Sequence, residues 1–260
     1  MQAAPILQDR LSFAPWMEGR TWRLPGIVPL AGDWLIRDEA FAGQMAERDR
    51  LIGGQGGLVH ALLPAGRAAA EELYAMVMGE LEADAGYAFG DGLVVRPDRV
   101  RVELLPDAPL VTLGRLVQAD LCLIQPQAGE HVLTGAVLCF PASWTLAQKI
   151  GKSLTGIHGP VPDYDGGMAR RVQRLFDAVR VESPLMRFNA LVYDDPTLHQ
   201  PRLEGVERPR PVDKLYLRSE RQCLVRLPQT GAVLFAIHTR LVRMEDLAPE
   251  ARDGLAAAGL

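Results

Sequence analysis

Hydrophobic residues recur at helical spacing in two stretches of the N-terminal half of the chain. One stretch runs from Asp38 to about Leu51, and the other runs from Arg67 to about Asp84, where a glycine soon follows as a stop signal. The chain before them, to about Trp34, is rich in Pro, Gly and Trp and has no clear periodicity. The pattern predicts an irregular N-terminal segment that wraps the core, followed by two helices.

The pattern changes to that of strands at about position 114. The stretches GRLVQADLCLIQPQ and HVLTGAVLCFP mix alternation with β-branched residues, and the QAGE between them has hairpin length. A helical region follows, in which the Gly- and Pro-rich GIHGPVPDYDGG separates SWTLAQKIGKSL from GMARRVQRLFDAVR. Three more strands are predicted in LMRFNALVYD, LYLRSERQCLVRLP and AVLFAIHTRLVRM, and a short helix in the C-terminal tail.

Two antiparallel strands, a helical middle and three further antiparallel strands are the element order of a PAS-type fold. We therefore expect an α/β (α+β) protein with a PAS-like five-stranded antiparallel sheet, helices on one face and an N-terminal helical extension. The expected parts are a wrapping and helical segment over residues 1–100, a PAS-like core over 101–245 and a helical tail over 246–260. Because PAS-like sheets commonly hold a ligand against their helical middle, the GIHGPVP stretch is expected at a pocket.

The composition is that of an ordinary soluble globular protein. Of the 260 residues, 48% are hydrophobic and 23% are charged, and the formal net charge is -4. This charge disfavours a nucleic-acid partner, and no apolar run is long enough to span a bilayer. The odd number of cysteines (Cys122, Cys139 and Cys223), without a CxxC pair or a secretory signal, argues against structural zinc or an iron–sulfur cluster and for a cytoplasmic location.

The stretch from Lys149 to Gly167 holds two candidate motifs. Its GKS tripeptide suggests a phosphate-binding loop, but such a loop needs a glycine five positions before Gly151, where Leu146 stands. His158 lies between glycine and proline in IHGPVP, and a rigid loop of this kind can hold an imidazole in one orientation, as an axial iron ligand requires. A structural role is the more common one for a single histidine, so both explanations stay open at this point.

The other histidines give weaker signals. His238 lies within a predicted strand and is expected to be a sheet residue. Surface positions are expected for His60, His131 and His199, because they adjoin polar or turn-forming stretches.

A second candidate group lies in LRSERQCLVRLPQTGAVLF. Alternation along a strand puts Arg218, Glu220 and Gln222 on one face and Ser219, Arg221 and Cys223 on the other. The group is explained either as a solvated edge with a cross-strand ion pair or, since apolar residues surround it, as buried charges that need a partner or a ligand. In the second case Arg221 and Arg226 are suited to bind a carboxylate or a propionate through paired hydrogen bonds. No serine elbow, HExxH motif or dinucleotide fingerprint follows a strand, so binding of NAD or flavin by this chain is not expected.

An ordered series of motifs resembles the family of haem-dependent oxidative N-demethylases, which includes the haem subunit of dimethylamine monooxygenase. The motifs are QADLCLI, CFPASWTLAQKIGKSLTGIHGPVP, the RFN of MRFNALVYDDP, and SERQCLVRLPQTGAVLFAIHT, and they run from about Asp120 to Thr239. Family members are similar to PAS domains and oxidise an N-methyl group at a histidine-ligated haem b, releasing formaldehyde. The resemblance therefore implies a haem-dependent monooxygenase, consistent with the predicted element order.

The resemblance also implies roles for particular residues. His158 corresponds to the proximal iron ligand, that is, the metal-binding residue. The further cofactor-binding candidates are Lys152 and Arg226. The polar groups implied to meet oxygen or the amine are Arg221, Glu220 and Gln222. Ala190 stands where members often carry a tryptophan, and this departure could widen the pocket and change the amine substrate.

The resemblance implies partners as well. The chain shows no reductase module, so NADPH, FMN and an iron–sulfur centre are expected only in partner subunits, with a small methylated amine and O2 as substrates. The alternative class of function is a PAS-like haem or small-ligand sensor without turnover. Sensors usually pass a signal to an attached output domain, and the short Ala/Gly-rich tail favours the enzyme.

Overall fold

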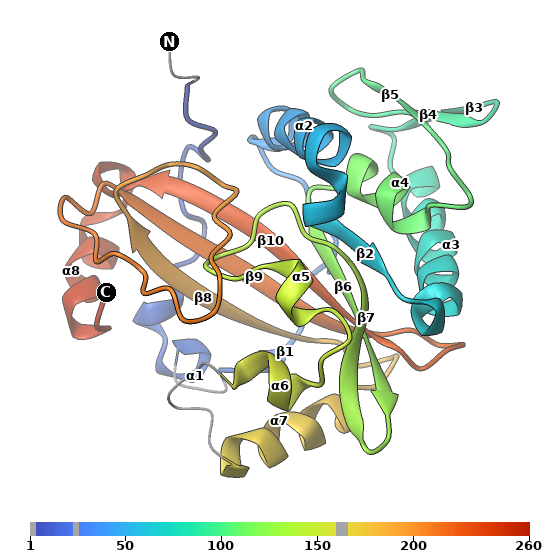
Figure 1. The fold of residues 1–260 in the computed structure, drawn as a ribbon. Coiled ribbons are helices and arrows are strands. Elements are labelled where there is room, and N and C mark those ends of the chain that lie inside the picture. The colour runs from blue at the N-terminus through green and yellow to red at the C-terminus, as the bar shows by residue number, and fades with distance from the viewer. Residues whose placement is uncertain (1–3, 23–25, 160–165) are drawn as a thin grey trace.

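A seven-stranded antiparallel sheet forms the centre of the computed structural model, which describes residues 4–22, 26–159 and 166–260 (Figure 1). The strand order is β1-β8-β9-β10-β6-β7-β2. The strands are β1 (Val28–Pro29), β2 (His60–Leu62), β6 (Asp120–Gln127), β7 (Glu130–Val137), β8 (Leu185–Tyr193), β9 (Tyr216–Arg226) and β10 (Val233–Arg243). The five strands expected from the sequence lie next to one another, but β1 and β2 extend them at the two edges. The sheet therefore has seven strands rather than five.

The helices agree with the sequence pattern in most places. The α-helices of the described residues are α1 (Gly19–Trp22), α2 (Phe41–Val59), α3 (Arg67–Ala83), α4 (Pro109–Leu116), α5 (Leu146–Lys149), α6 (Leu154–His158), α7 (Gly166–Ala178) and α8 (Pro249–Ala257). Three short 3-10 helices are η1 (Pro15–Met17), η2 (Pro64–Gly66) and η3 (Met244–Asp246). The start of the first predicted strand is wrong, because its GRL residues belong to α4. The described helices include none with the length and apolar character needed to cross a membrane.

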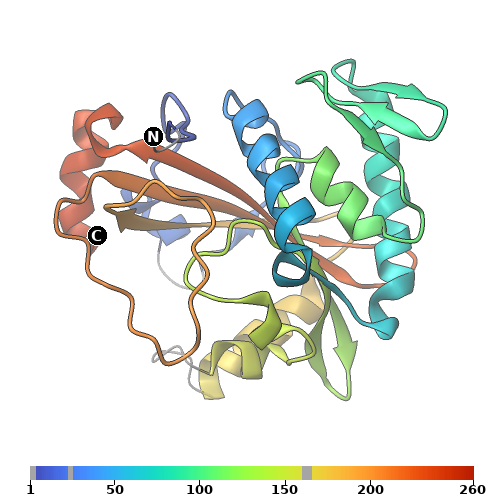
Figure 2. The ribbon, with the colours of Figure 1, turned by 45° about the horizontal axis from the view of Figure 1, so that its top comes forward.

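A second, three-stranded sheet was not expected from the sequence. It consists of β3 (Ala88–Gly90), β4 (Leu93–Val95) and β5 (Arg101–Glu103) in that order. It lies beside α4, and α2, α3 and α4 lie side by side (Figure 2). Its buried residues Val94 and Val102 belong to the same core cluster as the helices, so the small sheet extends the main core.

Different parts of the chain cover the two faces of the main sheet. The face that carries Arg221 and Cys223, here called the Arg221 face, shares a core cluster with α2, α3 and α4. The opposite face, here called the Glu220 face, carries Glu220 and Leu224 and packs on the apolar side chains of α5, α6 and α7. Helices therefore cover both faces, whereas the sequence pattern predicted one. The segment 194–215 between β8 and β9, orange in Figure 1, lies on the same side as α5.

Candidate functional site

His158 is the last residue of the short helix α6, whereas the sequence pattern predicted an irregular loop. The side chain of Ser153 caps the start of α6 by accepting a hydrogen bond from the backbone of Gly156 at 3.3 Å. At its end, Nδ1 of His158 donates to the carbonyl oxygen of Leu154 at 2.9 Å. This hydrogen bond favours the tautomer with the lone pair on Nε2, as in many metal-ligating histidines. The rest of the predicted loop, residues 160–165, lies outside the described part of the chain.

The surroundings of His158 favour a neutral imidazole. Burial lowers its pKa below the usual value, the hydrogen bond to Leu154 raises it, and the charges of Lys149 and Arg187 lower it further. The neutral form is the one that binds a metal ion. Leu154 and Ile157 of α6 pack against the Glu220 face, so His158 at the end of α6 lies on this side of the sheet.

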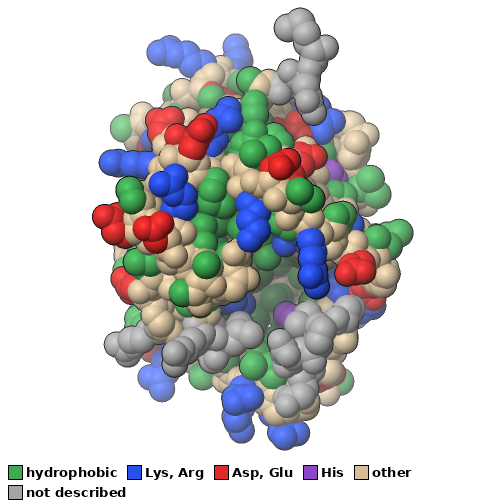
Figure 3. Space-filling model, turned by 90° about the vertical axis from the view of Figure 1, so that its left-hand side faces the viewer, with side chains coloured by type: hydrophobic (Ala, Val, Ile, Leu, Met, Phe, Trp, Pro, Cys, Tyr) green, Lys and Arg blue, Asp and Glu red, His purple; other side chains and the backbone are tan. Residues whose placement is uncertain are grey.

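This side of the molecule is hollowed. Figure 3 shows a recess with hydrophobic side chains inside it, a histidine at its edge, and Lys or Arg side chains around it. The apolar residues between the sheet and α5 to α7 include Leu224 and Ile237 on the sheet and Leu154 and Ile157 on α6. The sheet and the helices α5 to α7 therefore meet through apolar side chains.

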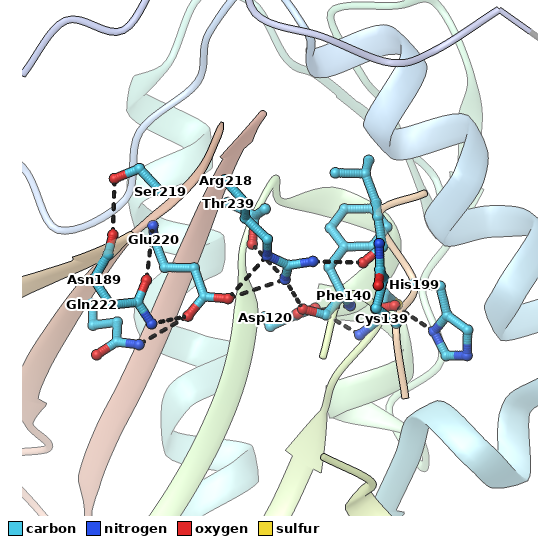
Figure 4. A network of polar contacts seen from close by, with 12 residues as sticks. Asp120, Cys139, Phe140, Asn189, His199, Arg218, Ser219, Glu220, Gln222 and Thr239 are labelled. Atoms are coloured by element: carbon cyan, nitrogen blue, oxygen red, sulfur yellow. Dashed lines mark hydrogen bonds and ion pairs between the residues drawn. The ribbon is translucent and has the colours of Figure 1, made fainter. Parts of the chain in front are cut away.

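The polar residues of the Glu220 face form a connected group on β8 and β9. The strand register pairs Arg187 with Gln222 and Asn189 with Glu220. Oε2 of Glu220 accepts hydrogen bonds from Asn189 Nδ2 at 2.8 Å and from Gln222 Nε2 at 2.9 Å, and Oε1 forms an ion pair with Arg218 at 3.0 Å (Figure 4). Glu220 is only 5% exposed, so its carboxylate is buried with its hydrogen bonds made.

Arg218 connects this group to the loops beside the sheet. Its guanidinium donates to the carbonyl oxygen of Leu198 at 2.8 Å and also to that of Phe140. The backbone at Phe140 is held from its other side, because the carboxylate of Asp120 accepts from the amides of Cys139 at 2.7 Å and Phe140 at 2.9 Å (Figure 4). The network thus fixes segment 194–215 and the chain after β7 against the sheet.

Two buried polar atoms of the Glu220 face have no hydrogen-bond partner in the described parts of the chain. They are Nε of Arg187 and Oε1 of Gln222. Burial lowers the pKa of Arg187, and the nearby charge of Glu220 raises it, but no ion pair forms between Arg187 and any described residue. A buried guanidinium nitrogen and a buried acceptor without partners are costly, so this pair is suited to a bound ligand.

The structure does not bring Arg221 together with His158. Arg221 lies on the opposite face from Glu220 and Gln222, and its guanidinium donates to three backbone carbonyls of the N-terminal segment. These are the carbonyls of Ala31 at 3.2 Å, Asp33 at 2.7 Å and Trp34 at 3.3 Å. Of the three polar residues that the resemblance indicated, two therefore share the side of His158.

Arg226 and Lys152 also have protein partners. Arg226 donates to the carbonyl oxygens of Phe176, Val179 and Gly231 at 2.5 to 2.6 Å, so it ties the end of α7 to the β9–β10 hairpin. Lys152 is exposed and lies 3.5 Å from Glu204. Both side chains therefore contact protein groups, and neither is available only for a cofactor.

The sequence argument missed three polar residues on the side of the sheet where His158 lies. Arg187 and Asn189 are the first and third residues of RFN, and their alternation on a strand was the available signal. Lys149 gave no signal, yet its ammonium group donates to the carbonyl oxygen of Ile157 at 2.5 Å and pairs with Glu204 at 2.6 Å. Lys149 therefore joins α5, α6 and segment 194–215.

Ala190 does not widen the pocket beside His158. It lies opposite Ser219 on the Arg221 face, where it is 3% exposed and packs with Trp16, Leu217 and Val242. The expectation that this alanine changes the pocket is therefore wrong. Its small size is matched to packing on the other side of the sheet.

The remaining histidines lie apart from this group. His238 is in β10, as predicted, and Nε2 donates to Oδ2 of Asp38 at 2.8 Å. The surface position expected for His131 is wrong: it is 1% exposed, Gln173 of α7 donates to its Nδ1 at 2.6 Å, and burial lowers its pKa. His60 and His199, also expected at the surface, are half-buried.

A comparison with protein families identifies the relatives of this fold and site. Residues 28–258 match a family model described as haem-dependent oxidative N-demethylase, alpha subunit-like. The chain belongs to this family. The match begins at β1 and ends within the C-terminal tail, so it includes every strand and both faces of the sheet. The family resemblance inferred from the motifs is thereby confirmed.

The residues of the candidate site fit the haem named in the family description. A neutral imidazole ends α6, α6 packs on apolar side chains of the sheet, and the buried Nε of Arg187 offers a donor to an anionic group. One histidine and an apolar pocket are the minimum that a haem protein needs. His158 is the residue of this group suited to hold the iron.

Proposed function

We propose that this chain is the haem-binding subunit of a monooxygenase that removes an N-methyl group from a small methylated amine. The overall reaction consumes the amine, dioxygen, two protons and an electron pair, and yields the demethylated amine, formaldehyde and water. A reductase partner supplies the electrons, with NADPH, FMN and an iron–sulfur centre bound outside this chain. The family match over residues 28–258 carries the proposal, and the placement of His158 supports it.

Residues of this chain bind and orient the reactants. His158 would hold haem b through Nε2, and the haem would supply the oxidation of the C–H bond beside nitrogen. Glu220 accepts from both Asn189 and Gln222, so it holds their amides in fixed orientations on the wall opposite α6. Arg187, rather than Arg221, is the cation on this face that has no ion pair within the described residues. We assign Arg221 and Arg226 to the stability of the fold.

Two further features agree with the proposal. The chain passes through β6 and β7, the helices α5 to α7 and then β8 to β10, which supports the likeness to PAS domains. All three cysteines are free and buried, which supports a reducing, cytoplasmic location.

Removal of the imidazole tests the haem assignment. Purified protein should carry b-type haem with a Soret band, and His158→Ala should lose that band while its circular dichroism stays native. His60→Gln is the matched control, because His60 is a half-buried histidine at the edge strand β2. Full haem occupancy in His158→Ala would refute the ligand. Haem binding without formaldehyde release, when excess chemical reductant supplies the electron pair in the presence of oxygen and amine, would instead identify a sensor.

A further inference from the structure

An unpartnered donor and an unpartnered acceptor lie directly across from each other on the Glu220 face. Arg187 of β8 and Gln222 of β9 are cross-strand partners, and side chains at such positions are neighbours. Even so, Nε of Arg187 and Oε1 of Gln222 are both buried without a hydrogen-bond partner in the residues described. Arg187 and Gln222 therefore offer a cationic donor and a neutral acceptor, side by side, to one ligand.

Neighbouring contacts explain why these two atoms do not find partners in the protein. The carboxylate of Glu220 already accepts from Arg218, Asn189 and Gln222, at 2.8 to 3.2 Å, which uses most of its acceptor capacity. The amide of Gln222 is oriented by its donation to Glu220, since the reverse orientation would set its oxygen against the carboxylate. Oε1 of Gln222 is thus left for a ligand.

The charges around this pair disfavour a simple amine. Arg218 is balanced by Glu220 at 3.0 Å, whereas Arg187 has no such counter-charge among the described residues. A small methylated amine is protonated at neutral pH, so it would bring a second positive charge beside Arg187 in a partly desolvated pocket. A carboxylate on the same molecule would remove this repulsion and bind the guanidinium.

We propose that the site binds a methylated amine that also carries a carboxylate, such as an N-methylated amino acid. Arg187 binds the carboxylate, and Oε1 of Gln222 accepts a hydrogen bond from the ammonium N–H. This assignment rests on the proposed function for the chemistry of the site. A haem propionate carries the same carboxylate chemistry, so the test distinguishes the two sources.

The substrate arm uses haem-loaded protein and isothermal titration calorimetry with N,N-dimethylglycine and dimethylamine. Dimethylglycine should bind the wild type more tightly than dimethylamine does. Arg187→Met should weaken dimethylglycine binding about tenfold to a hundredfold, the range for a charge-assisted hydrogen bond, and Arg187→Lys should weaken it less. Arg180→Met is the matched control, because Arg180 is exposed beyond α7, and it should bind normally. Tighter binding of dimethylamine, or wild-type affinity in Arg187→Met, would overturn the proposal.

The acceptor is tested with a ligand that has no N–H. Gln222→Met should weaken the binding of N,N-dimethylglycine and leave that of N,N,N-trimethylglycine unchanged. An equal loss for both ligands would show that the substitution only disturbs the pocket, and the role of Gln222 would then be rejected.

The haem arm titrates the haem-free protein with haem and with its dimethyl ester, following the Soret band. Arg187→Met should retain the wild-type affinity for both within about threefold, since a lost charged hydrogen bond would cost more than that. A loss of affinity for haem but not for the dimethyl ester would assign Arg187 to a propionate and overturn the substrate role. A wild-type chain that binds no haem would refute the proposed function instead, and the amino-acid titration could still be made on that chain.

Discussion

Three consecutive residues of β9 have different surroundings because successive side chains of a strand point to opposite faces. Glu220 and Gln222 join the polar group near His158, and Arg221 between them binds backbone carbonyls on the other face. Arg221 is 7% exposed, so its guanidinium is buried and makes three hydrogen bonds to backbone carbonyls. Its charge is used to attach residues 31–34 to the sheet.

Replacement of Arg221 should reduce the stability of the fold rather than the rate of amine turnover. Arg221→Ala removes three charge-assisted hydrogen bonds between β9 and residues 31–34, and the free energy of unfolding should fall by about 2 to 4 kcal/mol. Arg221→Lys should lose less, because it keeps a charged donor without the planar fork. Urea unfolding measures both effects, and haem affinity and amine turnover are measured on the folded fraction. Wild-type stability with impaired turnover would place Arg221 in the chemistry.

The sequence showed which residues of β9 share a face of the sheet, but it did not show which of the two faces lies on the side of His158. That face depends on where α6 packs, and α6 reaches the sheet through contacts of Leu154 and Ile157 that leave no local pattern. The same limit explains Ala190, whose effect was assigned to the pocket although its side chain lies on the other face. Alternation along RFN does predict that Arg187 and Asn189 share a face of the strand. The register with β9 was needed to show that this is the face of Glu220 and Gln222.

At the scale of elements, Asp38 joins the start of α2 to the main sheet. Its carboxylate accepts from the backbone of Ala40 at 3.1 Å and from the side chains of Gln118 at 2.6 Å and His238 at 2.8 Å. Burial raises the pKa of Asp38, but the hydrogen bond and charge of His238, with hydrogen bonds from Gln118 and Gln8, outweigh burial and lower it to about 2. The ionised carboxylate is therefore part of the folded state.

This shift predicts how stability depends on pH. Because the folded-state pKa of Asp38 is lowered to about 2 from 3.8, its contribution is complete above about pH 4 and is lost as the pH falls towards 2. Asp38→Asn should lower the free energy of unfolding by at most about 2 kcal/mol at pH 7, and the two curves should converge near pH 2. Asp107→Asn, at a fully exposed position, is the control. A constant difference between wild type and Asp38→Asn from pH 7 to pH 2.5 would contradict the linkage.

Element boundaries differ from the sequence pattern where packing outweighs local propensity. The helix predicted to end near Leu51 continues to Val59 through four glycines, with a non-helical Gln55, because Leu51 and Val59 are both fully buried. The helix α4 occupies residues that were assigned to a strand, although Pro109 at its first turn was a start signal. Long strands with clear alternation, such as β9 and β10, were predicted within one or two residues.

At the scale of the whole molecule, short strands at the edges explain the difference between five and seven strands. β1 has two residues and β2 has three, too few for an alternating pattern to be visible. Both pair with long strands of the central five, so long-range contacts create them. The central order of strands and helices was predictable because each of its elements carries its own hydrophobic period.

The family description, alpha subunit-like, agrees with the expectation that this chain works with a redox partner. Removal of a methyl group with dioxygen requires an electron pair, and no dinucleotide-binding fingerprint follows a strand in the sequence. We therefore expect haem-loaded protein that has been reduced chemically, and that is supplied with one further reducing equivalent per haem, to release at most one formaldehyde per haem when it meets oxygen and amine. NADPH alone should support no turnover if, as proposed, a reductase partner passes the hydride electrons to the haem. Anaerobic reduction followed by stopped-flow mixing and a formaldehyde assay measures the single turnover. The His158→Ala variant, treated in the same way, provides the background, and sustained NADPH oxidation by the isolated chain would show that the electron donor lies within it.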